Sequence, residues 1–171
     1  MRHRTVPISF VPLKASHLEL LHAWLQEEHV KAFWDDGDRT LEQVLKHYFT
    51  PRQVESYIIN IEYNAVGYIQ LYPIENEHPY AKWRSHEGDT AGLDLFIGNR
   101  LFLNQGLSVP IIQEFVTILL QNRPLRRIIA DPEVSNAHAQ AMLTKAGMAK
   151  SADNIKNGSG KLHAIYYWDL E

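Results

Sequence analysis

The stretch LDLFIGNRLFLNQGLS, residues 93–108, decides the fold, because it predicts a strand, a loop and the start of a helix in direct succession. Residues 107–121 have the apolar periodicity of an amphipathic helix. Pro110 suits the first turn of that helix, where a missing N–H removes no intrahelical bond. Backbone N–H groups and the positive end of the helix dipole can bind an anion at such a junction. An ordinary strand–loop–helix connection that binds nothing fits the same spacing.

The sequence that follows this helix predicts a crossover back to the sheet. Residues 127–130 indicate a short buried strand, and residues 136–146 indicate another helix. Ser135 is its expected N-cap, and Gly147 is the expected left-handed residue at its end. Met148 would then make the hydrophobic contact of that cap.

The sequence before residue 93 predicts two helices. The first is indicated by apolar residues at three- and four-residue steps, namely Leu18, Leu21, Trp24 and Leu25. Ser16 is its expected N-cap, with Glu19 as the capping-box partner. The second helix is expected to follow Thr40 and to stop at Pro51.

Alternating and β-branched residues predict the remaining strands. These strands cover residues 54–61, 66–72, 90–97 and 162–170, with a further one near residues 6–12. A hairpin turn is expected over residues 62–65, a long loop over residues 73–89, and a turn-rich stretch over residues 154–160. The order predicts a mixed α/β (α+β) fold in which an antiparallel hairpin precedes a β-α-β crossover with parallel strands. Without a repeat or linker, residues 1–171 are expected to form a single domain.

Composition narrows the function. The chain has 171 residues, 45% of them hydrophobic, and a formal net charge of −3, which argues against a nucleic-acid binder held mainly by phosphate contacts. It has no cysteine, which excludes disulfides, thiolate metal sites and a cysteine nucleophile. No apolar stretch is long enough to span a bilayer, and no signal peptide is evident, so we expect a cytoplasmic protein.

Several enzyme classes lack their signatures. The nine histidines have no metal-ligand spacing, so we interpret them as scattered surface residues and expect no metal. A G-x-S-x-G elbow and a P-loop are also absent from the sequence.

Two segments carry a family resemblance. Residues 103–108, LNQGLS, fall on the pattern Gln/Arg-x-x-Gly-x-Gly/Ala, although only Gly106 matches it strictly. Residues 131–148, DPEVSNAHAQAMLTKAGM, are similar to a D-P-x-x-x-N-x-x-A-x-x-x-Y-x-K-A-G-F run. With the order of elements, these segments resemble the GNAT superfamily of acetyl-CoA-dependent N-acetyltransferases over nearly the whole chain.

This resemblance implies a mostly antiparallel central sheet with helices on both faces, and acetyl-CoA as co-substrate. It implies a pyrophosphate loop at Leu103, Asn104, Gln105, Gly106, Leu107 and Ser108. Asn136 would lie near the pantetheine or pyrophosphate arm, or would merely cap the helix. Backbone N–H groups near Phe96 and Ile97 would hold the thioester oxygen. The family's tyrosine, often the general acid to the leaving thiolate, is Leu143 here, so water or another group would have to protonate the thiolate.

Within the superfamily, the chain is most similar to the aminoglycoside 6'-N-acetyltransferases. The similarity lies in residues 17–25, 29–34, 66–70 and 92–94. It implies direct transfer in a ternary complex to the 6'-amino group of an aminoglycoside, and hence a role in antibiotic resistance. A sister group that acylates siderophore precursors usually has His at the position of Asp94, which favours the aminoglycoside-like branch.

Asp94 is the candidate catalytic residue. It stands between Leu93 and Leu95, so it would face a cleft if these leucines face the other side of the sheet. There it would act as a general base for the ammonium group or would orient the amine. A partly exposed strand residue with no role fits the same position.

Acidic loops with aromatic residues suit a polycationic sugar, because carboxylates pair with ammonium groups and rings stack on sugar faces. The candidate acceptor-binding residues are Trp34, Asp35, Asp36, Tyr80, Trp83, Glu87, Asp89, Asp94 and Asp131, with Asp38 in the first acidic loop. The same charges would also suit simple solvated loops.

Two other functions stay open. One is an acyltransferase for a siderophore precursor or another amine, with a longer acyl-CoA among its donors. The other is an acyl-CoA-binding sensor without catalysis, because the tyrosine is missing and the pyrophosphate loop is imperfect. In each case the expected partners are coenzyme A and small molecules, without nucleic acid or membrane, and the chain would be a monomer or a homodimer.

Overall fold

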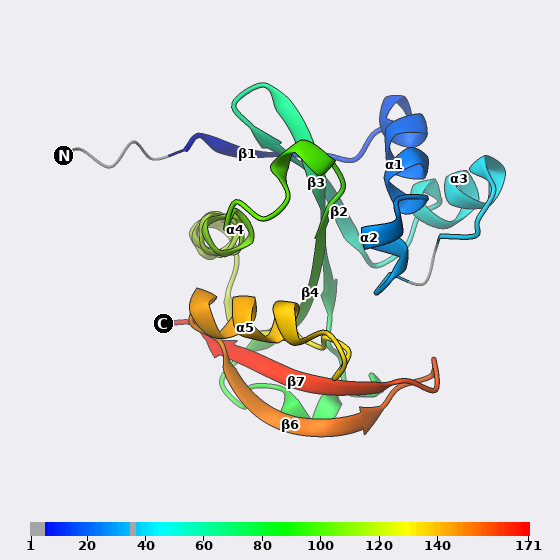
Figure 1. Cartoon of the computed structure of the whole chain (residues 1–171). Coiled ribbons are helices and arrows are strands. Elements are labelled where there is room, and N and C mark those ends of the chain that lie inside the picture. Colours follow the sequence, from blue (N-terminus) through cyan, green and yellow to red (C-terminus); the bar gives the residue numbers. More distant parts are fainter. Residues whose placement is uncertain (1–5, 35–36) are drawn as a thin grey trace. The chain divides into compact units, whose positions relative to one another are not determined.

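The computed structural model describes residues 6–34 and 37–171 (Figure 1). Their strands form a mixed seven-stranded sheet with the order β1-β2-β3-β4-β5-β7-β6. The chain divides into two compact units, residues 1–70 with 95–107 and residues 71–94 with 108–171. The predicted fold class is confirmed, whereas the single domain stays a prediction.

The first unit holds the N-terminal helices and one end of the sheet. Its elements are β1 (Ile8–Pro12), the 3-10 turn η1 (Ala15–His17), α1 (Leu18–Leu25), α2 (Glu28–Lys31), α3 (Leu41–Phe49), β2 (Glu55–Ile61), most of β3 (Asn64–Pro73), the end of β4 (Asp89–Ile97) and the 3-10 turn η3 (Arg100–Phe102). β1 pairs antiparallel with β2, from Ile8 opposite Ile61 to Pro12 opposite Tyr57. The helices pack on a core of aliphatic and tyrosine side chains, namely Leu21, Leu25, Val30, Val44, Tyr48 and Tyr68.

The second unit contains the crossover. Its elements are the rest of β3 and β4, the 3-10 turn η2 (Ala81–Trp83), α4 (Ser108–Asn122), β5 (Leu125–Ala130), α5 (Ala137–Ala146), β6 (Ala149–Lys156) and β7 (Leu162–Asp169). β4 pairs parallel with β5, as the crossover requires, and β7 lies antiparallel to both β5 and β6. Figure 1 shows α5 running along the hairpin of β6 and β7. A small core of Ile74, Tyr80, Ile129 and Ile165 lies in this unit.

Both predicted N-caps, Ser16 and Ser135, are wrong, and each lies one residue before the N-cap of its α-helix. Ser16 lies inside the 3-10 turn η1, whose cap is Lys14, so α1 starts only at Leu18 and Glu19 is not a capping-box residue. At α5 the cap is Asn136, whose Oδ1 accepts the Ala139 N–H at 3.1 Å, so the predicted Ser135 cap is wrong. The predicted end of α5 is confirmed, because Gly147 has a φ of 109°.

The strands differ from prediction at the start of β3 and at β6. The hairpin turn is only residues 62–63, because β3 already begins at Asn64. β6 was not predicted at all, and it occupies part of the predicted turn-rich stretch 154–160. Its sequence AKSADNIK is rich in residues that are depleted in strands and has no apolar alternation.

Gly92 on β4 has no room for a side chain. A Cβ there would lie 2.2 Å from two ring carbons of Tyr72. We expect Gly92→Ala to destabilise the protein by about 1–3 kcal/mol, because the ring must move within a packed strand pair. The measurement is the urea midpoint of unfolding, with Gly158→Ala as the matched control, since a Cβ at Gly158 meets nothing within 4 Å. Equal midpoints for the two variants would contradict the crowding at Gly92.

Candidate active site

Asp94 and Asp131 lie in one region of the second unit, because both act on the phenols of Tyr72 and Tyr80. The last registered pair of these strands is Gly92 with Ile129, and each aspartate lies two residues beyond its member of that pair. Because alternate strand residues share a face, Asp94 lies on the face to which Gly92 belongs, whereas Asp131 comes directly after the end of β5. The Tyr72 ring covers Gly92 on that face. Two carboxylates from segments far apart in sequence thus come together.

Tyr80 covers Asp131 from the loop between β3 and β4. Its hydroxyl donates a hydrogen bond of 2.6 Å to Asp131 Oδ2, and the tyrosine is only 4% exposed. Burial raises the pKa of Asp131, while the Tyr80 hydrogen bond and the nearby His163 oppose that shift. This carboxylate is therefore costly to desolvate, and a bound cation would relieve that cost.

Both carboxylates act on the same two phenols. Burial raises the pKa of Tyr80 above its usual range, and Asp131 and, more weakly, Asp94 raise it further. Burial also raises the pKa of Tyr72, and here Asp94 is the next cause, followed by Asp131. The phenols consequently stay neutral, and the carboxyl groups of Asp94 and Asp131 are the acidic groups of the cluster. Such a cluster attracts a positively charged ligand.

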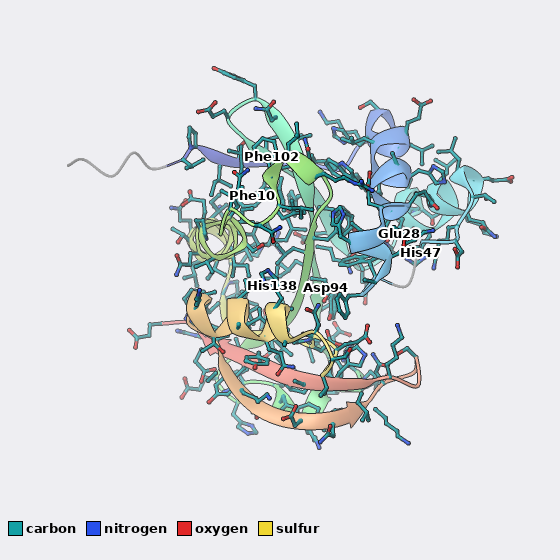
Figure 2. The ribbon with its side chains drawn as sticks, viewed as in Figure 1. Phe10, Glu28, His47, Asp94, Phe102 and His138 are labelled. Carbon is teal, nitrogen blue, oxygen red and sulfur yellow. The ribbon has the colours of Figure 1, made fainter. Side chains whose placement is uncertain are left out.

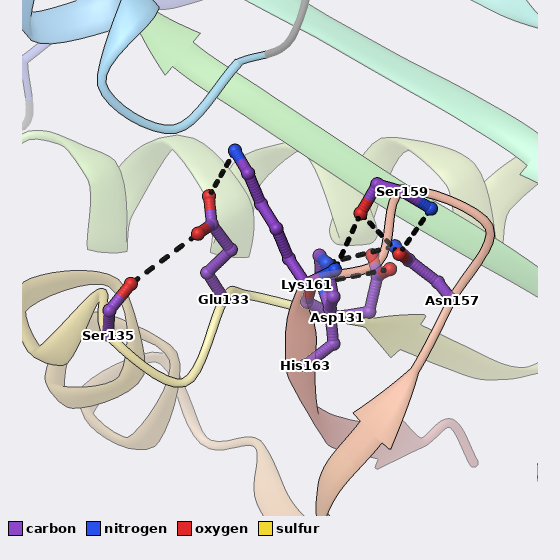
Figure 3. A network of polar contacts seen from close by, with 7 residues as sticks. All are labelled: Asp131, Glu133, Ser135, Asn157, Ser159, Lys161 and His163. Carbon is purple, nitrogen blue, oxygen red and sulfur yellow. Dashed lines mark hydrogen bonds and ion pairs between the residues drawn. The ribbon is translucent and has the colours of Figure 1, made fainter.

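His163 on β7 lies next to Asp131 (Figure 3). Its Nδ1 lies 2.6 Å from the Asp131 backbone oxygen and 3.6 Å from Asp131 Oδ2. Its Nε2 lies 2.9 Å from Asn157 Nδ2. Sequence reasoning missed both residues, and the interpretation of the histidines as surface residues is wrong for His163, whose side chain is 12% exposed. The half-buried histidines also include His22, His29 and His78.

The other acidic candidates lie apart from this cluster or outside the description. Glu87 and Asp89 are exposed, and neither is among the groups that shift the pKa of Tyr72 or Tyr80. Asp35 and Asp36 lie outside the described residues. In the same loop, Asp38 is exposed and lies 4.0 Å from Lys31.

The aromatic candidates pack mainly against protein. Trp34 donates its indole N–H to the Tyr48 hydroxyl at 3.0 Å and lies edge-on to Phe96 at 4.9 Å between ring centroids. Trp83 contacts Tyr80 edge-on at 5.8 Å. Both tryptophans are half-buried, so stacking on a sugar stays a prediction for them.

The predicted pyrophosphate loop, residues 103–108, contains two residues with left-handed backbone conformations. Asn104 and Gly106 both adopt left-handed conformations, with φ of 59° and 66°. A Cβ at Gly106 would meet nothing within 4 Å, so its position is open. The loop leads directly into α4, which starts at Ser108. Consecutive N–H groups in such a turn can form an anion-binding concavity.

A match to a known family model shows the family of this chain. Residues 14–154 match the family model described as an acetyltransferase (GNAT) domain. The chain belongs to the GNAT acetyltransferase family. GNAT enzymes use acetyl-CoA, and related solved structures contain coenzyme A.

The relatives of this GNAT chain include aminoglycoside enzymes. It is 27% identical over 141 residues to the aminoglycoside N(6')-acetyltransferase type 1 of Klebsiella pneumoniae, covering 78% of this chain and 69% of the relative. The fold is similar to that of the aminoglycoside acetyltransferase AAC(6')-Ib in complex with coenzyme A, with a TM-score of 0.83, 21% identity and 95% of each chain covered. An aminoglycoside N(6')-acetyltransferase from Legionella pneumophila gives a TM-score of 0.76 at 23% identity, covering 99% of this chain and 95% of the other.

Two positions matter for the chemistry of a GNAT enzyme. Leu143, which replaces the tyrosine of the family pattern, is buried at 4% exposure and supplies no proton. Ile97 is held at its backbone oxygen by His29 Nε2 at 2.8 Å, which fixes the strand whose N–H groups are predicted to face the thioester.

The described ranges 6–34 and 37–171 contain no cluster of three or more His, Asp or Glu side chains suited to a metal ion. None of the helices in these ranges has the length and apolar character needed to cross a membrane.

Proposed function

We propose that this GNAT enzyme transfers the acetyl group of acetyl-CoA to a primary amine of a small polycationic acceptor, with the 6'-amino group of an aminoglycoside as the leading candidate. The observation that carries this proposal is the pair Asp94 and Asp131, which act on the same buried phenols of Tyr72 and Tyr80. Two carboxylates in one low-dielectric cluster suit an acceptor with more than one ammonium group. The similarity to aminoglycoside N(6')-acetyltransferases supports the same acceptor class.

In the proposed mechanism, Asp131 binds one ammonium group of the acceptor and Asp94 receives the proton of the reacting one, directly or through water. The neutral amine then attacks the thioester carbon. Its C–N bond forms, the C–S bond breaks, and the coenzyme A thiolate leaves. The nitrogen of the new amide must still lose one proton, and because Leu143 has no ionisable group, this proton passes through water to the thiolate. Most of the rate would come from holding the two substrates in line.

The remaining residues have proposed roles in binding acetyl-CoA. Backbone N–H groups of Phe96 and Ile97 polarise the thioester oxygen. Residues 103–108 bind the pyrophosphate with their backbone, and Asn136 contacts the pantetheine or pyrophosphate arm. The Asn136 Oδ1 already accepts the Ala139 N–H, so its Nδ2 is the atom we assign to the cofactor.

The test is acetyl-CoA-dependent thiol release by the purified protein. The acceptor panel contains 6'-amino aminoglycosides, their 6'-hydroxy counterparts, a hydroxylamine siderophore precursor, spermidine and a lysine peptide. We expect turnover with the 6'-amino compounds and none with the 6'-hydroxy compounds. Turnover confined to the hydroxylamine would transfer the assignment to siderophore chemistry. Binding of acetyl-CoA in calorimetry without release for any acceptor would favour the sensor.

A further inference from the structure

Tyr80, His163 and Asn157 form a connected set of polar contacts around Asp131. Tyr80 donates to the carboxylate at 2.6 Å, and His163 contacts the backbone oxygen of the same aspartate. Asn157 contacts the histidine, because its Nδ2 lies 2.9 Å from His163 Nε2, and its amide also lowers the pKa of the Tyr80 phenol. These contacts tie the turn between β6 and β7 to the end of β5 (Figure 3).

The partners of His163 fix the position of its proton. A backbone oxygen only accepts, so Nδ1 of His163 must carry the hydrogen in its contact with Asp131. Asn157 Oδ1 accepts the Ser159 N–H at 2.9 Å and the Ser159 hydroxyl, which directs its Nδ2 toward His163. Nδ2 only donates, so Nε2 of the histidine must accept. Every polar atom of the imidazole is therefore satisfied in the neutral Nδ1–H form.

We infer that His163 is a positioning residue for Asp131 that works only as the neutral imidazole, and that its protonation weakens the binding of the cationic acceptor. A second proton on Nε2 would point at the Asn157 amide hydrogens, which breaks the contact between His163 and Asn157. The imidazolium would also lie 3.6 Å from Asp131 Oδ2 and would compete with the acceptor for this carboxylate. This inference rests on the proposed role of Asp131 in acceptor binding.

Apart from Asp131, the charged groups near His163 add little net charge to its surroundings. Glu133 forms an isolated β-bridge with His163, but its carboxylate lies 3.5 Å from Lys161 Nζ, so the two charges offset each other. The groups that face Asp131 from the loop between β3 and β4 are Tyr80 and His78. Burial lowers the pKa of His78 and favours its neutral form, so it adds little charge to the cluster.

The kinetic test compares three variants over about pH 5.5 to 8, the range in which an imidazole takes up its proton. His163→Asn keeps a donor near the Nδ1 position but cannot titrate, so its acceptor KM at pH 8 should lie within about twofold of wild type. His163→Ala loses the donor, and its KM should be roughly 2- to 10-fold higher at every pH. On acidification the ratio of wild-type to His163→Asn KM should rise about fivefold or more, since the protonation of the acceptor itself affects both proteins equally. The exposed His138, replaced by Asn at saturating acetyl-CoA, serves as the control without a pH effect (Figure 2).

A constant ratio of the two KM values across this range would overturn the inference. A second measurement does not depend on turnover. In ¹⁵N NMR of histidine-labelled protein at pH 8, His163 should give the signals of the Nδ1–H tautomer, and the Nε2–H tautomer or an imidazolium would overturn the inference directly. If NMR shows the expected tautomer while no acceptor reacts, the proposed function fails. The neutral His163 imidazole as a positioning residue for Asp131 is then still supported.

Discussion

Asp94→Asn is expected to lower kcat for the best acceptor by roughly 100-fold or more, which is the usual contribution of a general base. The asparagine has nearly the same shape, but it cannot accept the ammonium proton. The amine would then have to lose its proton to bulk water before attack. Because Asn still fills the same space beside Tyr72, we expect the fold to persist and the KM for acetyl-CoA to stay close to wild type.

The measurement is steady-state thiol release across pH, with Glu114→Gln as the matched control. Glu114 is an exposed carboxylate on α4 in the same unit, so its loss should leave kcat unchanged. In the Asp94→Asn protein, the remaining rate should increase as the pH rises, because more of the amine is then neutral. An unchanged kcat at neutral pH would remove Asp94 as the base and leave at most a role in orienting the amine.

Asp131→Asn is expected to raise the KM for a polycationic acceptor by about 10- to 100-fold, the equivalent of one lost hydrogen bond to a charged group. The kcat at saturating acceptor should change much less than in Asp94→Asn. The amide oxygen of the introduced asparagine can still accept the Tyr80 hydroxyl, so the loss isolates the charge. The comparison acceptor is a monoamine, whose KM should change less because it has no second ammonium group. Equal changes for both acceptors would contradict binding of a second ammonium group at Asp131.

The same variant should be more stable than wild type at neutral pH. Burial raises the pKa of Asp131, so the folded state prefers the protonated carboxyl. Above the unfolded pKa of about 3.9, the folded state binds more protons than the unfolded one, and stability falls as the pH rises through the folded pKa. Asparagine has no ionisable carboxyl, so the Asp131→Asn protein does not lose stability in this way as the pH rises. Thermal melts at about pH 4 and pH 7.5 should therefore show the Tm advantage of Asp131→Asn mainly at the higher pH.

The crossover and its helices were predictable because their signals are local. The strand, loop and helix over residues 93–108 follow one another in sequence, and Gly147 has the left-handed conformation that its place after a helix requires. The cap at Ser16 was wrong because a 3-10 turn precedes α1, and the cap at Ser135 was wrong because the neighbouring Asn136 binds the free N–H group. Only the path of the backbone decides between Ser135 and Asn136.

The site was only partly predictable because its contacts are not local. Asp94 and Asp131 could be selected one at a time, but their shared effect on Tyr72 and Tyr80 follows only from the fold. The hydrogen bond from Tyr80 to Asp131 spans 51 residues, and that from His163 spans 32. His163 follows a turn-rich segment in the sequence, and no spacing distinguishes it from the exposed His86 or His138.

β6 ends the sheet on one side, and its unpaired edge would be a template for strands of other molecules. Its composition works against such pairing. Lys150, Asp153 and Lys156 are exposed, and the register with β7 shifts twice along the strand. Charges and irregular register are the usual protection of an edge strand against aggregation. The sequence AKSADNIK predicts a strand only weakly, because the charged and polar residues that protect an edge strand have low β-propensity. Replacing its lysines with valines would strengthen the strand prediction and would make the protein more prone to aggregation.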